Sequence, residues 1–149
     1  KLMKGARDVI NELKKRGIYV AIVSSGVARF IGSIAHILKV DDWAANDFSW
    51  DKEGYLSGPA PAMVDSHDKG VMVDKLARIN DFQANKIWTV GDSGTDLSMQ
   101  IPGSNFIGFN PARERSMNEF TKADVPVIKE KDLTKIWNIM FSEDFPNDN

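Results

Sequence analysis

The sequence contains no cysteine, which excludes disulfide bonds, zinc sites built from thiolates and cysteine nucleophiles. It also has no excess of basic charge, because 19 basic residues face 21 acidic ones and the formal net charge is −2. Nucleic acids and anionic membranes bind to a concentrated basic face, so we expect neither as a partner. No apolar run approaches the roughly 18 residues of a membrane span, and no signal peptide is visible. We therefore expect a cytoplasmic protein.

The 149 residues have the size and composition of one globular domain, with 42% hydrophobic and 27% charged residues. Apolar residues at helical spacing predict helices over 6–16, 27–38, 71–79 and 133–141. Continuous apolar runs predict buried strands over 18–24, 86–90, 105–109 and 125–128. Strands alternating with helices indicate an α/β fold with a doubly wound parallel sheet. The segment "DKEG" at 51–54, between aromatic-rich arms, predicts a small β-hairpin insertion.

Small polar residues follow the first predicted strand. Ser24, Ser25 and Gly26 come directly after its apolar run, before the second predicted helix. A hydroxyl and the free N–H groups of a helix N-terminus form a ready site for a phosphate, and ligands of such sheets bind at the carboxyl ends of the strands. The alternative is that one of the two serines only caps the helix.

Two carboxylates follow the strand over 86–90, in the segment "GDSGTD" at 91–96. Asp92 and Asp96 are four residues apart in a glycine-containing turn, which suits Mg²⁺, since this ion takes one or two protein carboxylates and completes its shell with water and phosphate. The alternative is a turn in which Asp96 favours the dipole of the following helix. "GDSG" is also similar to the nucleophile loop of trypsin-like proteases, but the α/β pattern and the absence of cysteine argue against that class.

Lys69 stands just before the helix predicted over 71–79. The N-terminus of a helix disfavours a cation, so a lysine at this position indicates that an anion shares the site. The alternative is a surface lysine without a role.

The order of "VSSG" at 23–26, "KG" at 69–70 and "GDSGTD" at 91–96 resembles the haloacid dehalogenase superfamily, in its phosphoserine-phosphatase-like branch. The resemblance extends over about residues 2–135. It implies a phosphatase, a Mg²⁺-dependent phosphomonoester hydrolase that acts through an aspartyl-phosphate on a small phosphorylated metabolite such as phosphoserine. Ser25 departs from the glycine usual in this branch, which leaves the substrate open.

The same resemblance implies a role for each motif residue. Ser24 would hydrogen-bond a phosphate oxygen, with Ser25 and Gly26 in the same phosphate-binding segment. Lys69 would neutralise the nucleophile and the transferring phosphoryl group. Asp92 would ligate Mg²⁺, and Asp96 would either hold a metal-bound water or orient Lys69.

The family's first motif has two aspartates one residue apart after a strand, the first being the nucleophile, and no such pair follows an apolar strand here. We therefore expect residues 1–149 to be the C-terminal part of a phosphatase core domain, inactive alone. A preceding segment is expected to complete the sheet between the strands over 18–24 and 86–90. One alternative is a non-catalytic binding or assembly domain of this fold. Another is a nucleotide-binding or receiver-type domain, although "VSSGVARF" is a poor G-x-G-x-x-G match.

Overall fold

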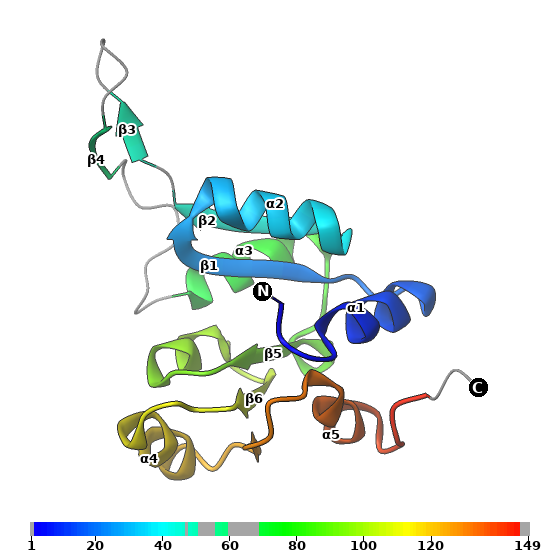
Figure 1. Cartoon of the computed structure of the whole chain (residues 1–149). Coiled ribbons are helices and arrows are strands. Elements are labelled where there is room, and N and C mark those ends of the chain that lie inside the picture. The colour runs from blue at the N-terminus through cyan, green and yellow to red at the C-terminus, as the bar shows by residue number, and fades with distance from the viewer. Residues whose placement is uncertain (1, 47, 51–55, 60–68, 147–149) are drawn as a thin grey trace.

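The computed structural model describes residues 2–46, 48–50, 56–59 and 69–146 (Figure 1). Its elements are α1 (Ala6–Lys15), β1 (Ala21–Val27), α2 (Ala28–Leu38), β2 (Asp42–Asn46), β3 (Phe48–Trp50), β4 (Leu56–Pro59), α3 (Gly70–Asn80), η1 (Ala84–Lys86), β5 (Trp88–Gly91), η2 (Gly94–Met99), β6 (Asn105–Phe109), α4 (Glu114–Lys122), β7 (Val127–Ile128), η3 (Leu133–Ile136) and α5 (Trp137–Phe141), where η marks a 3-10 helix. Among these, no helix has both the length and the apolar character that crossing a membrane requires.

The strands confirm the predicted α/β class with parallel pairing. β1 pairs with β2, and β5, β6 and β7 form a second group in that order, with every pair in both groups parallel. The described strands thus form two parallel groups rather than one continuous sheet. β3 and β4 pair antiparallel, as the hairpin prediction requires, while the turn at 51–55 lies outside the described residues.

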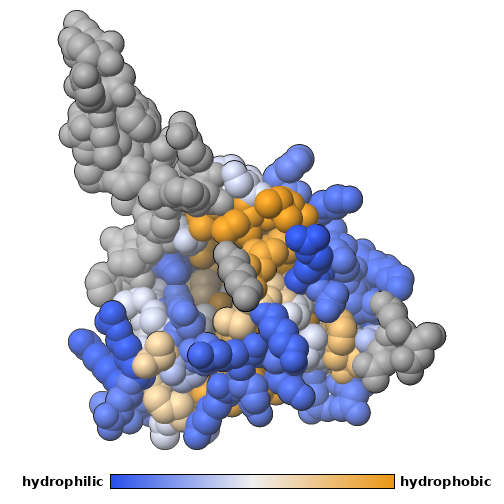
Figure 2. Space-filling view, in the orientation of Figure 1, coloured by the Kyte–Doolittle hydropathy of each residue, from blue (hydrophilic) through white to orange (hydrophobic). Residues whose placement is uncertain are grey.

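β1 and β5 are each paired on one side only in the described residues: β1 with β2, and β5 with β6. Figure 1 shows the order β2, β1, β5, β6 from top to bottom, and among the described residues β1 and β5 do not pair with each other. Val23 and Val90 on these strands are only half-buried, whereas Phe106 and Ile107 of β6 are buried. Figure 2 shows hydrophobic side chains gathered in the region of β1 and α2. This lack of pairing between β1 and β5 agrees with the expectation that another segment lies between them, which stays a prediction.

Two apolar clusters hold the elements together. In the first, Val9 and Leu13 of α1 pack with Ile107 of β6 and the fully buried Trp137 of α5. This packing explains why the apolar stripe of α1 forms a helix here: its buried face meets the sheet. The second cluster contains Val73, Met99, Phe106 and Phe120 and joins α3, η2, β6 and α4. It brings the start of α3 against η2.

The structure corrects the predicted buried face of α3. The pattern placed Val71, Met72, Leu76 and Ile79 on one apolar stripe. Met72 is buried and Leu76 half-buried, but Val71 and Ile79 are 64% and 68% exposed. The buried side chains are Met72, Val73 and Ala77, so the covered face is rotated from the predicted one toward Val73 and Ala77. Val73 belongs to the second cluster, and Met72 packs with Ala44 of β2. An apolar pattern alone does not say which of two adjacent faces is covered.

The end of the first strand also differs from the prediction. Ser24, Ser25 and Gly26 were expected to follow the strand, but β1 continues to Val27 and α2 begins at Ala28. Pairing shifts along this stretch, since β1 advances four residues from Val23 to Val27 while β2 advances two, from Ala44 to Asn46. The two additional residues form a bulge. A bulge takes backbone groups out of regular pairing, so the segment differs from a regular strand without being a free turn.

Gly108 in β6 offers a test of the packing against α4. A Cβ atom at this position would lie 2.6 Å from Cδ2 of Phe120, whose side chain is fully buried. We expect Gly108→Ala to lower the free energy of unfolding by about 1–3 kcal/mol, because a buried ring has to move. Urea denaturation measures this loss. The double variant Gly108→Ala with Phe120→Leu should lose less free energy of unfolding than the sum of the two single-variant losses, by about 0.5 kcal/mol or more. Strict additivity would contradict the contact.

Candidate active site

The segment "GDSGTD" joins the end of β5 to η2. Gly91 is the last residue of β5, and η2 begins at Gly94. Ser93 precedes η2 in an extended conformation and, with Asp96, forms a capping box. Such a box satisfies N–H groups that the first turn of a helix leaves free. The segment is therefore held by its own residues in one conformation at the carboxyl end of a parallel strand.

The carboxylate of Asp96 is the centre of this arrangement. Its Oδ1 accepts a hydrogen bond from Nζ of Lys69 at 2.6 Å. Its Oδ2 accepts from the backbone N–H groups of Asp92 at 3.0 Å and Ser93 at 3.2 Å. Burial by itself would raise the pKa of Asp96, but the hydrogen bond and charge of Lys69, with the backbone donors, hold this pKa below its ordinary value. Asp96 is therefore a buried anion with both oxygens in use.

Lys69 brings its charge to this anion from the start of α3. Its side chain is 13% exposed and that of Asp96 is 7% exposed, so the ion pair is largely removed from water. Removing one partner of such a buried pair leaves an uncompensated charge, which typically costs about 3–5 kcal/mol. The anion also offsets the unfavourable position of a cation at a helix N-terminus. The carboxylate of Asp96 contacts Lys69 and the backbone of the loop, and its role in a reaction stays a prediction.

Gly91 permits the close approach of Asp96. A Cβ atom on Gly91 would lie 2.3 Å from Cβ and 2.7 Å from Cγ of Asp96. Both of these carbons lie at the base of the Asp96 side chain, so they cannot swing away as the tip of a flexible chain could. Only glycine at this position allows the carboxylate of Asp96 to lie against the end of β5.

Asp92 lies at the exposed part of the same loop. Partial withdrawal from water raises its pKa, and the nearby charge of Asp96 acts in the same direction. In the described residues no group of three or more histidine, aspartate or glutamate side chains gathers as a metal site. Asp92 nevertheless suits one position in the shell of a Mg²⁺ ion, which needs only one or two protein carboxylates. Its carboxylate is exposed, whereas that of Asp96 is occupied by Lys69.

The serine segment lies at the same end of the molecule. Val23 packs against the cluster that contains Val73 and also against the cluster of Ala44 and Met72. Met72 and Val73 belong to the first turn after Lys69, so Ser24, which follows Val23, lies near the start of α3. Ser24 is half-buried. Ser25 and Gly26 have a described backbone in β1, but their side-chain surroundings lie outside the described part of the structure.

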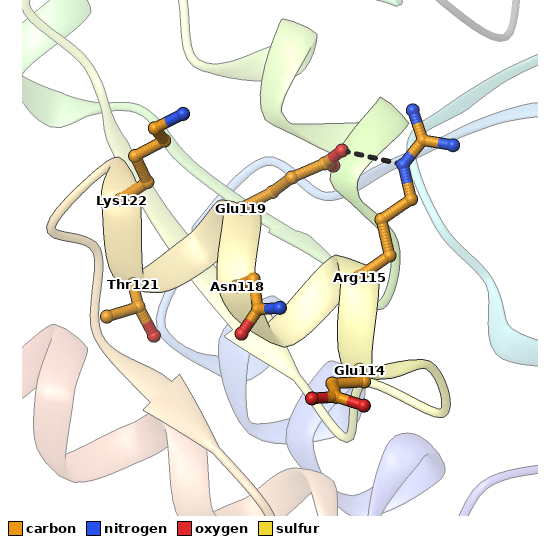
Figure 3. Close-up of a pocket in the computed structure, with 6 residues that line it drawn as sticks. All are labelled: Glu114, Arg115, Asn118, Glu119, Thr121 and Lys122. Atoms are coloured by element: carbon orange, nitrogen blue, oxygen red, sulfur yellow. Dashed lines mark hydrogen bonds and ion pairs between the residues drawn. The ribbon is translucent and has the colours of Figure 1, made fainter.

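One pocket lies between the loop and α4, and a second lies on α4 alone. The first, about 710 Å³, is lined by Asp92, Ser93, Gly94, Thr95, Ser98, Ala112, Arg113, Arg115, Ser116 and Glu119. The second, about 590 Å³, is lined by six residues of α4 (Figure 3). Arg115 and Glu119 line both, and Nε of Arg115 donates to Oε1 of Glu119 at 3.2 Å. Of the two pockets, only the first is lined by Asp92.

Sequence reasoning did not identify three residues that support the loop. Ser116, buried at 6% exposure, accepts a hydrogen bond from the N–H of Gly94 at 3.2 Å. Thr95 and Ser93 share a hydrogen bond between their hydroxyls at 2.7 Å. Ser98 contacts both Lys69 and Thr95. Thr95 lies within the motif "GDSGTD" and Ser98 two residues after it, so both had a sequence signal, whereas Ser116 is remote in sequence and had none.

Residues 1–100 match the haloacid dehalogenase-like hydrolase family. The phosphoserine phosphatase of Methanocaldococcus jannaschii is 33% identical over 134 residues, which cover 89% of this chain and 61% of the relative. That of Wolinella succinogenes is 30% identical and is matched over 91% of this chain and 63% of its own length. The chain thus spans about three fifths of the length of these curated relatives.

Solved structures that resemble this chain also include phosphoserine phosphatases. A substrate-bound phosphoserine phosphatase complex superposes with a TM-score of 0.80 at 30% identity, over 93% of this chain and 63% of that chain. A phospho-aspartyl intermediate analogue of phosphoserine phosphatase superposes with a TM-score of 0.81 at 30% identity, over 94% of this chain and 65% of that chain. The likeness thus covers nearly all of this chain but only part of each neighbour.

Proposed function

The chain belongs to the haloacid dehalogenase-like hydrolase family, and on this premise we propose that it forms part of a Mg²⁺-dependent phosphomonoester hydrolase. The proposed substrate is a small phosphorylated metabolite of the phosphoserine type, and the reaction passes through an aspartyl-phosphate. The relatives and neighbours that carry the name phosphoserine phosphatase support this substrate class. Cytoplasmic action on a soluble metabolite is part of the same proposal.

One observation carries the proposal: a buried ammonium is held on a buried carboxylate, next to an exposed carboxylate at a strand end. Nζ of Lys69 lies 2.6 Å from Asp96, and the N–H of Asp92 donates to the same Asp96 carboxylate. Phosphoryl transfer requires mainly positioning and neutralisation of charge on the phosphoryl oxygens. A preorganised cation beside a carboxylate that can hold a metal ion supplies both.

Each residue then has a distinct part in the reaction. Lys69 neutralises the phosphoryl oxygens and the nucleophile, and Asp96 fixes the direction of its ammonium. Ser24 donates its hydroxyl hydrogen to a phosphate oxygen, with the backbone of Ser25 and Gly26 beside it. Asp92 would hold Mg²⁺, which, when bound, would neutralise further negative charge on the phosphate.

The nucleophile is proposed to lie on a strand between β1 and β5. Each of these strands is paired on one side only in the described residues, and their apolar side chains are half-buried. A strand placed there would pair with both and cover these side chains. We expect it from outside these 149 residues, since no Asp-x-Asp pair follows an apolar run in the sequence. Its carboxylate oxygen would attack phosphorus, the alcohol would leave with a proton, and water would then cleave the acyl phosphate to release inorganic phosphate.

The test uses the full-length protein that carries this chain, with phosphoserine, phosphothreonine, a sugar phosphate and an aryl phosphate as substrates. We expect release of inorganic phosphate in the presence of Mg²⁺, with the largest kcat/KM for phosphoserine. A preference for another phosphomonoester would change the substrate and keep the reaction. Binding of inorganic phosphate without hydrolysis of any of the four would contradict the proposal and favour a non-catalytic domain of this fold.

A further inference from the structure

Both the side-chain ammonium and the backbone N–H of Lys69 are hydrogen-bonded to a single short helix. Its side-chain ammonium contacts Asp96, and its backbone N–H donates to Oγ of Ser98 at 2.8 Å. Asp96 and Ser98 both belong to η2 (Gly94–Met99). Lys69 is therefore tied to η2 through its backbone as well as through its ammonium.

The contact with Ser98 replaces one that α3 cannot make for itself. Lys69 immediately precedes α3, and no side chain of its own helix end caps it. In a capping box the residue at the third helical position accepts the N–H of the residue before the helix. In α3 that position is Met72, whose side chain offers no oxygen acceptor. Ser98 supplies the acceptor from a different helix, 29 residues further along the chain.

The hydroxyl of Ser98 is used in both directions. It accepts from Lys69 and donates to the carbonyl oxygen of Thr95 at 3.1 Å. Thr95 directly precedes Asp96, so a single hydroxyl connects the backbone before α3 to the backbone beside the carboxylate. Ser98 also lines the pocket that contains Asp92. Alanine at this position would remove the acceptor of one bond and the donor of the other.

We propose that Ser98 is a positioning residue, which sets the ammonium of Lys69 relative to Asp92 through the backbone at the start of α3. This inference rests on the proposed function of the same site. Ser98 makes no contact with the reacting atoms in this role. Its effect arises because stabilisation of a transition state depends steeply on geometry, and displacements of about 1 Å away from the reacting atoms can cost up to about 100-fold in rate.

The test compares three variants of the full-length protein with phosphoserine as substrate. We expect Ser98→Ala to lower kcat about tenfold while KM changes less than about twofold, since the displaced charge acts mainly in the transition state. Ser98→Thr keeps the hydroxyl and should restore most of kcat. Ser104→Ala is the matched control: Ser104 is buried, its Oγ donates to the carbonyl of Ile101 at 2.8 Å, and it does not contact Lys69.

A second measurement does not depend on activity. Exchange of the Lys69 amide hydrogen, followed by NMR, should become about fivefold faster or more in Ser98→Ala and should not change in Ser104→Ala, because only the first removes its acceptor. Equal kcat for Ser98→Ala and Ser104→Ala, or loss of kcat that Ser98→Thr does not restore, overturns the inference. An inactive wild-type protein with the expected exchange change would instead contradict the proposed function and leave the contact established.

Discussion

Lys69→Met is expected to lower kcat by about 100-fold or more in the full-length protein, with a smaller rise in KM. The ammonium lies on a buried carboxylate at the carboxyl end of β5, aimed by Asp96 at a distance of 2.6 Å. A charge preorganised in this way favours the transition state of phosphoryl transfer more than the bound substrate, and losing such a group typically costs about 10²–10³ in kcat. Steady-state kinetics with phosphoserine and Mg²⁺ measure both constants.

The control for this variant must separate catalysis from folding, since Lys69→Met also leaves Asp96 buried without its cation. We expect a loss of about 3–5 kcal/mol in the free energy of unfolding for Lys69→Met, much of it recovered by adding Asp96→Asn. The double variant should be folded and still inactive. Lys75→Met, at an exposed position on the same helix, should retain activity. If folded Lys69→Met changes kcat/KM by less than about threefold, the Lys69–Asp96 ion pair serves the fold and not the reaction.

Asp92→Asn is expected to remove most of the Mg²⁺-dependent hydrolysis, by about 100-fold or more, without loss of the fold. Asp92 is exposed, and its backbone N–H donates to the Asp96 carboxylate, a hydrogen bond that the substitution keeps. An amide keeps the shape of the side chain but lacks the negative charge with which a carboxylate binds Mg²⁺. The Mg²⁺ concentration that gives half-maximal rate should rise in the variant, and EDTA should abolish the activity of the wild type.

Asp81→Asn is the matched control for this second prediction. Asp81 is exposed after the end of α3 with a φ of 57°, a left-handed conformation that asparagine adopts readily. The Asp81→Asn variant should therefore retain the activity and Mg²⁺ dependence of the wild type. Full activity of Asp92→Asn, or hydrolysis by the wild type in excess EDTA, would remove Asp92 from the metal site and require another ligand.

Local sequence signals identified most elements of the fold. The stripe of Ala6, Val9, Ile10 and Leu13 predicted α1, and all four side chains are buried in the structure. The run "KIWTV" predicted β5, which extends over Trp88–Gly91. These predictions succeeded because helix and strand periodicity are properties of neighbouring residues, and both segments have one dominant pattern.

The predictions that failed depended on which surfaces meet. Val71 and Ile79 have helical spacing and apolar side chains, yet both are exposed, because α3 is covered on the side of Met72 and Val73. Likewise Ser24 has the sequence context of a turn, while pairing with β2 extends β1 to Val27. Local periodicity predicts neither result, since each depends on a partner element that is distant in the sequence.

The sequence by itself determined the fold class and named the residues that we propose for the site. The order of "VSSG", "KG" and "GDSGTD" correctly placed Lys69 before a helix and Asp92 after a strand, whereas Ser24 lies within β1. Only the tertiary structure decided that Lys69 pairs with Asp96, that Gly91 makes room for this carboxylate, and that Ser98 holds the lysine backbone. The physical reason is that hydrogen bonds act over about 3 Å and fix direction, whereas residue spacing along the chain sets only which groups can reach the same edge of the sheet.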